Sequence, residues 1–252
     1  MIPLRDNIPS RTTPLVTYVI IAACSIAFGL QYLNQKEGHD LVLDYGMVPA
    51  RVTSDDPNPI VRLPMQVQSV TGPVIQLQDV QLPTATVTPW LTLLTCMFLH
   101  GGVMHFLGNM WFLYIFGDNV EDRLGHIGFA LMYLGTGVIA SMAHIMNDPA
   151  SGIPTIGASG AIAGVMGAYA WLYPKAKVQA ILPIPFFFRA FVIPAPVFLG
   201  IWFAMQTYSG IQSSPVGGGV AWWAHIGGFI ACLLYTSPSP RDQRGSRMPS
   251  SA

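Results

Sequence analysis

The sequence predicts an all-α membrane protein, a bundle of six transmembrane helices with a short, recessed fourth helix and a β-hairpin-like insertion in the first external loop. The chain has 252 residues, of which 52% are hydrophobic and only 10% are charged, whereas soluble domains are about 25% charged. Its mean hydropathy is +0.47. A soluble surface needs charges, so this deficit indicates segments that never meet water.

Six apolar segments can each cross a bilayer core, which takes about 20 helical residues, or fewer where the helix is short or shielded. In chain order they are 14–33, 102–117, 127–146, 157–173, 190–207 and 218–235. The first is too long for a cleavable signal peptide and lacks a clear small-residue cleavage site. Residues 1–235 are therefore expected to form one membrane domain.

Basic residues predict the orientation of these spans. They precede the first span and fill the loop after the fourth, as Arg5, Arg11, Lys175, Lys177 and Arg189. The loops 147–156 and 208–217 contain no Lys or Arg. Because cytoplasmic loops carry the excess of basic residues, both termini are expected in the cytoplasm. A compact six-span form without a targeting segment indicates a prokaryotic inner membrane.

Two segments lie outside the predicted bundle. The first loop, 34–100, is too long to be a bare connection, and along 65–82 apolar and polar residues largely alternate on both sides of Thr71-Gly72-Pro73. This pattern predicts a β-hairpin on the outer face, and a bland exposed insertion is favoured over a substrate-binding element. The tail 236–252 is polar and rich in Pro and Ser, and we interpret it as disordered and non-native.

Composition also excludes several kinds of partner. The net charge is zero, so there is no electrostatic basis for binding nucleic acid. Cys24, Cys96 and Cys232 are too far apart for a disulfide framework or a zinc ribbon and are expected to be small buried hydrophobes. His100 and His105 lack the His-Glu-x-x-His spacing of zinc proteases. We expect no metal and no cofactor.

Four polar side chains are predicted to lie at one depth of the bundle: His105, Asn109, Ser159 and His225. The second, fourth and sixth spans all run from outside to inside, and a helix rises about 1.5 Å per residue, so the histidines and Asn109 lie roughly 6–12 Å below the outer end. Ser159 joins them only if the fourth helix starts below the surface. A polar residue inside a span is costly and usually functional, so this layer is the candidate site, opening to the outer face.

Small residues allow the helices that carry this site to approach closely. Ser159, Ala163 and Gly167 form one small-residue stripe with Gly160 and Gly164 beside it, and Ala224 and Gly228 form another. Such pairs let helix backbones meet. The fourth and sixth spans are therefore expected to bring a serine hydroxyl within hydrogen-bond reach of an imidazole, about 2.6–3.2 Å.

That pairing predicts nucleophilic catalysis. A serine hydroxyl becomes a nucleophile when a neighbouring base takes its proton, and His225 is placed to act as that base for Ser159. His105, Asn109 and the backbone N–H groups at the start of the fourth helix, around Gly157, are candidate donors to the oxyanion. No carboxylate lies near His225 in the spans, so the unit is expected to be a dyad rather than a triad.

The ordered set His100-x4-His105-x3-Asn109, Gly157-Ala-Ser159-Gly160 and Ala224-His225-x-Gly227 resembles the rhomboid intramembrane proteases. The resemblance covers about 14–235, apart from the predicted hairpin. It implies a six-helix bundle that cleaves single-pass membrane proteins, with Ser159 and His225 catalytic and His105 and Asn109 serving the oxyanion. It also implies structural roles near the site for other positions: His100, Gly160, Gly164, Gly228, Glu121 and Arg123.

The sequence departs from the family pattern at two places. Some members have a Trp-Arg pair in the first loop, whereas Trp90 is followed here by Leu91. Some have a tyrosine four residues after the nucleophile that stacks on the catalytic histidine, and that position here is Ala163. Trp222 or Trp223 is a candidate replacement. These departures concern loop anchoring and substrate preference rather than the dyad.

The same residues also have non-catalytic interpretations. A lone transmembrane serine usually bonds its own helix backbone, and a lone buried histidine is more often an interhelical hydrogen-bond partner. The alternative function is a catalytically silent membrane-helix-binding, chaperone-like protein or a transporter on the same bundle. A transporter is expected to show inverted repeats around a midplane site, and the chain has no visible internal repeat. The expected partners are transmembrane protein substrates and the bilayer.

Overall fold

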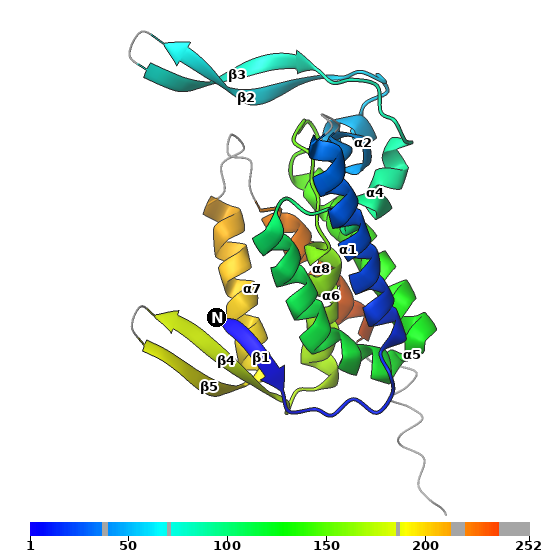
Figure 1. Cartoon of the computed structure of the whole chain (residues 1–252), viewed down its shortest axis with the longest axis vertical. Coiled ribbons are helices and arrows are strands. Elements are labelled where there is room, and N and C mark those ends of the chain that lie inside the picture. Colours follow the sequence, from blue (N-terminus) through cyan, green and yellow to red (C-terminus); the bar gives the residue numbers. More distant parts are fainter. Residues whose placement is uncertain (37–39, 70–71, 185–186, 213–219, 237–252) are drawn as a thin grey trace, which may run out of the picture.

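Helices make up most of the fold in the computed structural model, which describes residues 1–36, 40–69, 72–184, 187–212 and 220–236. The long helices are α1 (Leu15–Lys36), α5 (Val103–Asn147), α6 (Ser159–Leu172), α7 (Ala195–Gln212) and α8 (Trp222–Thr236). They stand side by side in Figure 1. Residues 237–252 of the predicted tail 236–252, and the loop glycines at 217–219, lie outside the described residues, whereas Thr236 is the last residue of α8.

Helix α5 is two helices joined at one residue. Gly125 has φ 72° and ψ 163°, which is not helical, and such a left-handed φ suits glycine because it has no Cβ. Cys96, just before α5, contacts Ser141, late in it, with 3.7 Å between Sγ and Oγ. The chain therefore reverses at Gly125. The first half, 103–124, is longer than the predicted span 102–117, and the second half, 126–147, agrees with the predicted 127–146.

Two helices of the described residues are long and apolar enough to cross a membrane, Leu15–Gln35 and Val103–Asn147. The segments Ser159–Leu172 and Trp222–Leu233 are apolar but shorter. Helix α6 is the centre of the core, because every residue from Gly160 to Tyr169 is buried. It packs between α5 and α8.

Glycines set how closely these helices pack. A Cβ added to Gly228 would lie 2.0 Å from the carbonyl oxygen of Gly160, and one on Gly164 would lie 2.5 Å from Oγ1 of Thr136. Real Cβ atoms do not approach other heavy atoms that closely. The backbones of α6 and α8 thus touch at a crossing that only glycine permits, consistent with the small-residue stripes in the sequence.

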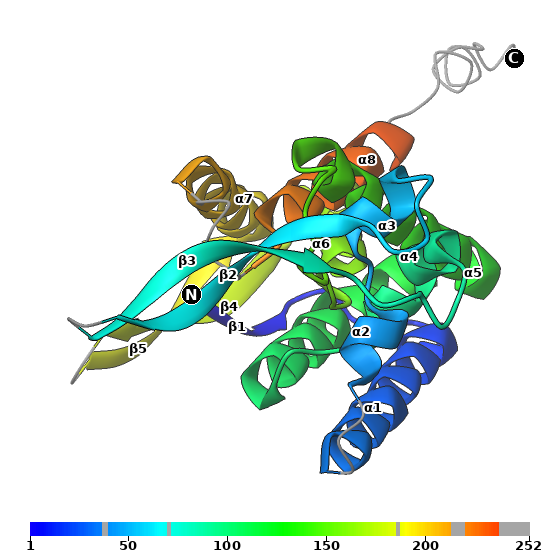
Figure 2. The ribbon, with the colours of Figure 1, turned by 90° about the horizontal axis from the view of Figure 1, so that it is seen from above.

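The first loop contains a β-hairpin of β2 (Ile60–Ser69) and β3 (Gly72–Gln81), paired antiparallel from Ile60↔Gln81 to Ser69↔Gly72. It begins five residues before the predicted 65–82. Val61 and Leu82 pack at its base on Val48 and Ala50. The rest of the hairpin extends beyond the end of the helices (Figure 1), and seen from above it reaches away from α1 and α5 (Figure 2). Short helices fill the remainder of this loop: α2 (Leu41–Tyr45), α3 (Pro49–Thr53), η1 (Pro89–Leu91), α4 (Thr92–Thr95) and η2 (Cys96–Phe98).

A second, unexpected sheet lies at the other end of the bundle (Figure 1). Strand β1 (Ile2–Asp6) pairs with β4 (Lys177–Ile184), which pairs with β5 (Phe187–Pro194), all antiparallel. The predicted fifth span, 190–207, is therefore wrong at its start, because 187–194 form a strand whose backbone hydrogen bonds go to β4. Helix α7 begins at Ala195 instead. Helix α8 likewise begins at Trp222 rather than 218.

Candidate active site

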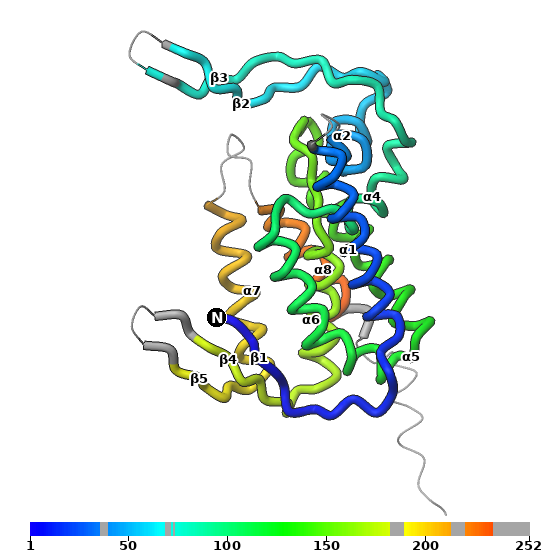
Figure 3. Tube along the Cα trace, viewed as in Figure 1, coloured from blue at the N-terminus to red at the C-terminus, as the bar shows by residue number. Residues whose placement is uncertain are grey.

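Ser159 is the first residue of α6, reached through the non-helical segment 148–158. Backbone hydrogen bonds fix this segment: Thr155 pairs with Met47, and the Gly157 N–H donates to the Cys96 carbonyl at 2.9 Å. Gly157 has φ +127°, which strongly favours glycine. The connection turns down from beside α2 into α6 (Figure 3). It delivers Ser159 to the N-terminus of a buried helix.

The structure brings Ser159 and His225 into contact. Nε2 of His225 lies 2.7 Å from Oγ of Ser159. Nδ1 of the same ring lies 2.7 Å from Oε1 of Gln206 on α7. An amide oxygen only accepts hydrogen bonds, so Nδ1 carries the proton and Nε2 presents its lone pair to the serine hydroxyl. This is the protonation state that a general base requires.

His105 lies against the same place from α5. Its Nδ1 accepts a hydrogen bond from the Gly101 N–H at 3.3 Å, so the neutral ring carries its proton on Nε2. A Cβ added to Gly157 would lie 2.9 Å from that Nε2 and 3.6 Å from Oγ of Ser159. The bare α-carbon of Gly157 thus separates an N–H donor from the serine hydroxyl.

Asn109 and the start of α6 offer further donors. Asn109 lies one helical turn after His105, on the same face of α5; it is buried, and its Nδ2 has no hydrogen-bond partner among the described residues. The first N–H groups of α6, including those of Ser159 and Gly160, have no intrahelical acceptor. N–H groups without an intrahelical acceptor at a helix N-terminus favour negative charge.

Of the residues expected to support the site, four lie near it. The buried ring of His100 packs 5.4 Å from that of His105, and the backbone of His100 exchanges two hydrogen bonds with the Gln31 amide of α1. Gly160, Gly164 and Gly228 form the helix crossings described above. His100 therefore supports the His105 ring from behind.

Glu121 and Arg123 do not lie near the site, which corrects the sequence-based expectation. Glu121 comes twelve positions after Asn109 on the same helix, a rise of about 18 Å. Glu121 is buried and accepts hydrogen bonds from the Val16 and Thr17 N–H groups at the start of α1. Arg123 is exposed. The role of Glu121 is to anchor α1.

Sequence reasoning missed two residues of α7 that surround His225. Gln206 bonds Nδ1, and the Trp202 ring lies 6.0 Å from the imidazole. Trp222, one of the two tryptophans considered from the sequence, contacts His225 edge-on at 6.1 Å. The available signal was a single amide within an otherwise apolar run, four residues after a tryptophan and so on one helix face.

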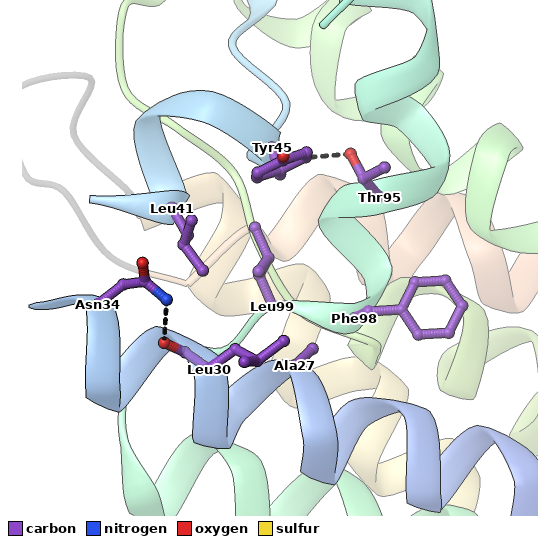
Figure 4. Close-up of a pocket in the computed structure, with 8 residues that line it drawn as sticks. All are labelled: Ala27, Leu30, Asn34, Leu41, Tyr45, Thr95, Phe98 and Leu99. Carbon is purple, nitrogen blue, oxygen red and sulfur yellow. Dashed lines mark hydrogen bonds between the residues drawn. The ribbon is translucent and has the colours of Figure 1, made fainter. Parts of the chain in front are cut away.

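The described residues contain no group of three His, Cys, Asp or Glu side chains placed to hold a metal ion. All three cysteines are free and buried. A separate apolar cavity of about 370 Å³ lies away from Ser159, between α1, α2 and the segment before α5 (Figure 4). It is bounded by α1 residues such as Leu30 and by Tyr45 and Leu99, none of which belongs to the Ser159 site.

Comparison with known proteins gives the family. The model of the Rhomboid domain matches residues 88–239, more than half of the chain and all of the site. The chain belongs to the rhomboid family. It is therefore an integral membrane protein with a helical membrane fold.

Curated rhomboid relatives are similar over parts of the chain. The putative rhomboid protease YdcA of Bacillus subtilis is 35% identical over 83 residues, covering 33% of this chain and 41% of that protein. The mitochondrial Rhomboid protein 1 of Saccharomyces cerevisiae is 27% identical over 174 residues, or 64% and 46% of the two chains. Rhomboid protease GluP of B. subtilis is 34% identical over 149 residues, or 59% and 27%. The chain spans less than half the length of each of these relatives.

Proposed function

We propose that this rhomboid protein is an intramembrane serine endopeptidase that hydrolyses peptide bonds in or near transmembrane segments of membrane proteins. The observation that carries the proposal is the 2.7 Å contact between Oγ of Ser159 and an imidazole nitrogen whose lone pair faces it. A structural serine at the start of a helix needs no such partner. Relatives named as proteases add support.

The proposed reaction has two halves. Ser159 Oγ attacks the substrate carbonyl carbon while Nε2 of His225 takes the hydroxyl proton, and the resulting oxyanion accepts hydrogen bonds from His105, Asn109 and the N–H groups at the start of α6. The C–N bond then breaks, and His225 gives its proton to the leaving amine. Water, deprotonated by His225, releases the acyl group from Ser159 by the same steps.

A cleavage assay tests this function directly. Purified protein in detergent is mixed with a fluorogenic transmembrane peptide, and wild type is compared with Ser159→Ala and His225→Ala. We expect each variant to lose activity by on the order of 10³-fold or more, because either group alone supports little chemistry. A fluorophosphonate probe should label wild type and not Ser159→Ala. Helix binding without cleavage or labelling would instead support the silent, chaperone-like alternative.

We also propose a topology and a location. The six helical segments, with α5 counted as two, span the plasma membrane of a prokaryote. Both termini lie in the cytoplasm, and the site opens to the outer face. Residues 1–235 form this membrane domain, and residues 236–252 are a non-native tail. The placement of basic residues supports this orientation. Alkaline phosphatase fused after Ser151 should be active and after Lys175 inactive; the reverse pattern would invert the topology.

A further inference from the structure

Gln206 is a buried amide at the centre of an apolar helix. It is 9% exposed, and its Oε1 lies 2.7 Å from Nδ1 of His225, on the ring edge opposite the serine. Trp202 lies four residues earlier on the same face of α7 and contacts the same ring. Gly210, four residues later, lies against Trp222. This face of α7 therefore packs against His225 and its surroundings rather than facing solvent or lipid.

The hydrogen bond selects one of two tautomers. A neutral imidazole carries its proton on either nitrogen, and only the Nδ1–H form can accept the proton of Ser159. In the Nε2–H form the ring would donate to the serine oxygen and could not act as its base. The Gln206 amide presents its oxygen to Nδ1 and so favours the productive form: in this orientation the alternative tautomer would set two lone pairs against each other.

We propose that Gln206 is a positioning residue that holds His225 in the Nδ1–H tautomer and in the orientation that faces Ser159. The inference rests on the proposed function and extends its dyad to a Ser159–His225–Gln206 series. In serine proteases with a triad a carboxylate fills this place and also stabilises the imidazolium. A neutral amide supplies the hydrogen bond and the orientation without a net charge, so its effect is expected to be smaller.

The test compares Gln206→Leu, which removes the acceptor at similar volume, with Gln206→Glu, which keeps it. In the peptide cleavage assay Gln206→Leu should lower kcat about 10- to 100-fold with KM within about twofold of wild type, and Gln206→Glu should restore most of the activity. Gln212→Leu is the matched control, because Gln212 is exposed on the same helix and bonds only Tyr208 among the described residues. It should behave like wild type.

A second readout does not depend on cleavage. In protein with 15N-labelled histidine, long-range ¹H–¹⁵N correlations report which ring nitrogen carries the proton, and the His225 signals are assigned by their loss in His225→Ala. Wild type and Gln206→Glu should show the Nδ1–H form, and Gln206→Leu a mixture or the Nε2–H form. Should Gln206→Leu fail to fold, Gln206→Met provides the same comparison.

Either of two results overturns the inference: wild-type kcat in the folded apolar variant, or an unchanged tautomer despite lower kcat. The latter result would make Gln206 a packing residue. Absence of cleavage and probe labelling in wild type would contradict the proposed function instead, and the tautomer measurement would still decide the role of Gln206.

Discussion

At the scale of single residues, Gly157 combines two constraints that only glycine meets. Its φ of +127° is strained for any residue with a Cβ. A methyl group there would also lie 2.8 Å from Cε1 of His105. The ring could not yield without losing the Gly101 N–H that fixes its tautomer. The absence of a side chain at Gly157 thus permits both the backbone conformation before α6 and the position of His105, the proposed oxyanion donor.

We predict that Gly157→Ala lowers kcat for the transmembrane peptide at least about 10-fold, because the displaced His105 donor contributes to transition-state stabilisation. Gly108→Ala is the control: Gly108 lies on an exposed part of α5, and an added Cβ meets no atom within 4 Å. Cleavage rates of the two variants are compared in the same detergent. Equal rates for Gly157→Ala and wild type would contradict the assignment of this position.

At the scale of secondary structure elements, α1 is held by a carboxylate from another helix. Both carboxylate oxygens of Glu121 are used: Oε1 accepts from the Val16 N–H, and Oε2 from the Thr17 N–H and hydroxyl, at 2.7–2.8 Å. These are N–H groups of the first turn of α1, which have no partner within their own helix. A buried carboxylate at a helix N-terminus also complements the helix dipole.

We predict that Glu121→Leu destabilises the protein by about 1–3 kcal/mol, because it leaves buried N–H groups without acceptors. Arg123→Gln, two residues along α5 and exposed, should change stability by less than about 0.5 kcal/mol. Denaturant unfolding in detergent measures both. A Glu121 variant as stable as wild type would show that water replaces the carboxylate without cost.

At the scale of the whole molecule, the β2–β3 hairpin is an appendage of the helix bundle. Only its base is packed, where Val61 and Leu82 join a small cluster with Val48 and Ala50, separate from the main core. Arg51 secures the same region by donating to the carbonyls of Leu43 and Pro83. The hairpin beyond this base lies outside the helix bundle (Figure 2).

We predict that replacing residues 64–77 with an Asn-Gly turn leaves the bundle folded and cleavage of the transmembrane peptide within about twofold of wild type, because the base cluster remains intact and the short turn suits a hairpin. Thermal unfolding and the cleavage assay check this. A folded variant that no longer cleaves would show that the hairpin takes part in substrate binding.

The three-stranded sheet at the other end introduces a pH dependence. Burial raises the pKa of Asp6 in β1 above its ordinary value of 3.8, although Tyr169 donates a hydrogen bond to it. The folded state therefore holds this proton at pH values where the unfolded state has lost it. Its contribution to stability is complete below pH 3.8 and declines as pH rises through the raised pKa.

Asp6→Asn should remove that decline, because the amide does not titrate. The free energy of unfolding, measured from pH 3.5 to pH 7, should fall more with rising pH in wild type than in the variant. Because both proteins contain the same other carboxylates, the contributions of those groups to the pH dependence of stability cancel in the comparison. Parallel curves would mean that Asp6 titrates alike in the folded and unfolded states.

Much of the site could be predicted because its residues are polar side chains that open or interrupt apolar segments. Ser159 opens a glycine-rich span, and His225 interrupts another, so each stands out against its neighbours. Gln206 could not be found in this way. The predicted fifth span, 190–207, placed Gln206 at the edge of the membrane, where a polar side chain contacts water and is not unusual. The helix observed at Ala195–Gln212 puts it inside the bundle.

The sheet was missed for a related reason. Strand β1 meets β4 through pairs such as Ile2↔Ile181, and such contacts between distant parts of the chain leave no local periodicity. The β2–β3 hairpin was found because its strands alternate and flank a turn. Its start at Ile60 was missed, since the alternation is weaker there.

The sequence by itself determined the membrane class, the hairpin and the residues that carry the proposed chemistry, because hydropathy and spacing are local properties of a chain. The tertiary structure alone decided which atoms meet. A histidine tautomer depends on what each ring nitrogen faces: for His225 these are a serine on α6 and an amide on α7. Partners from different helices come together only when the bundle packs.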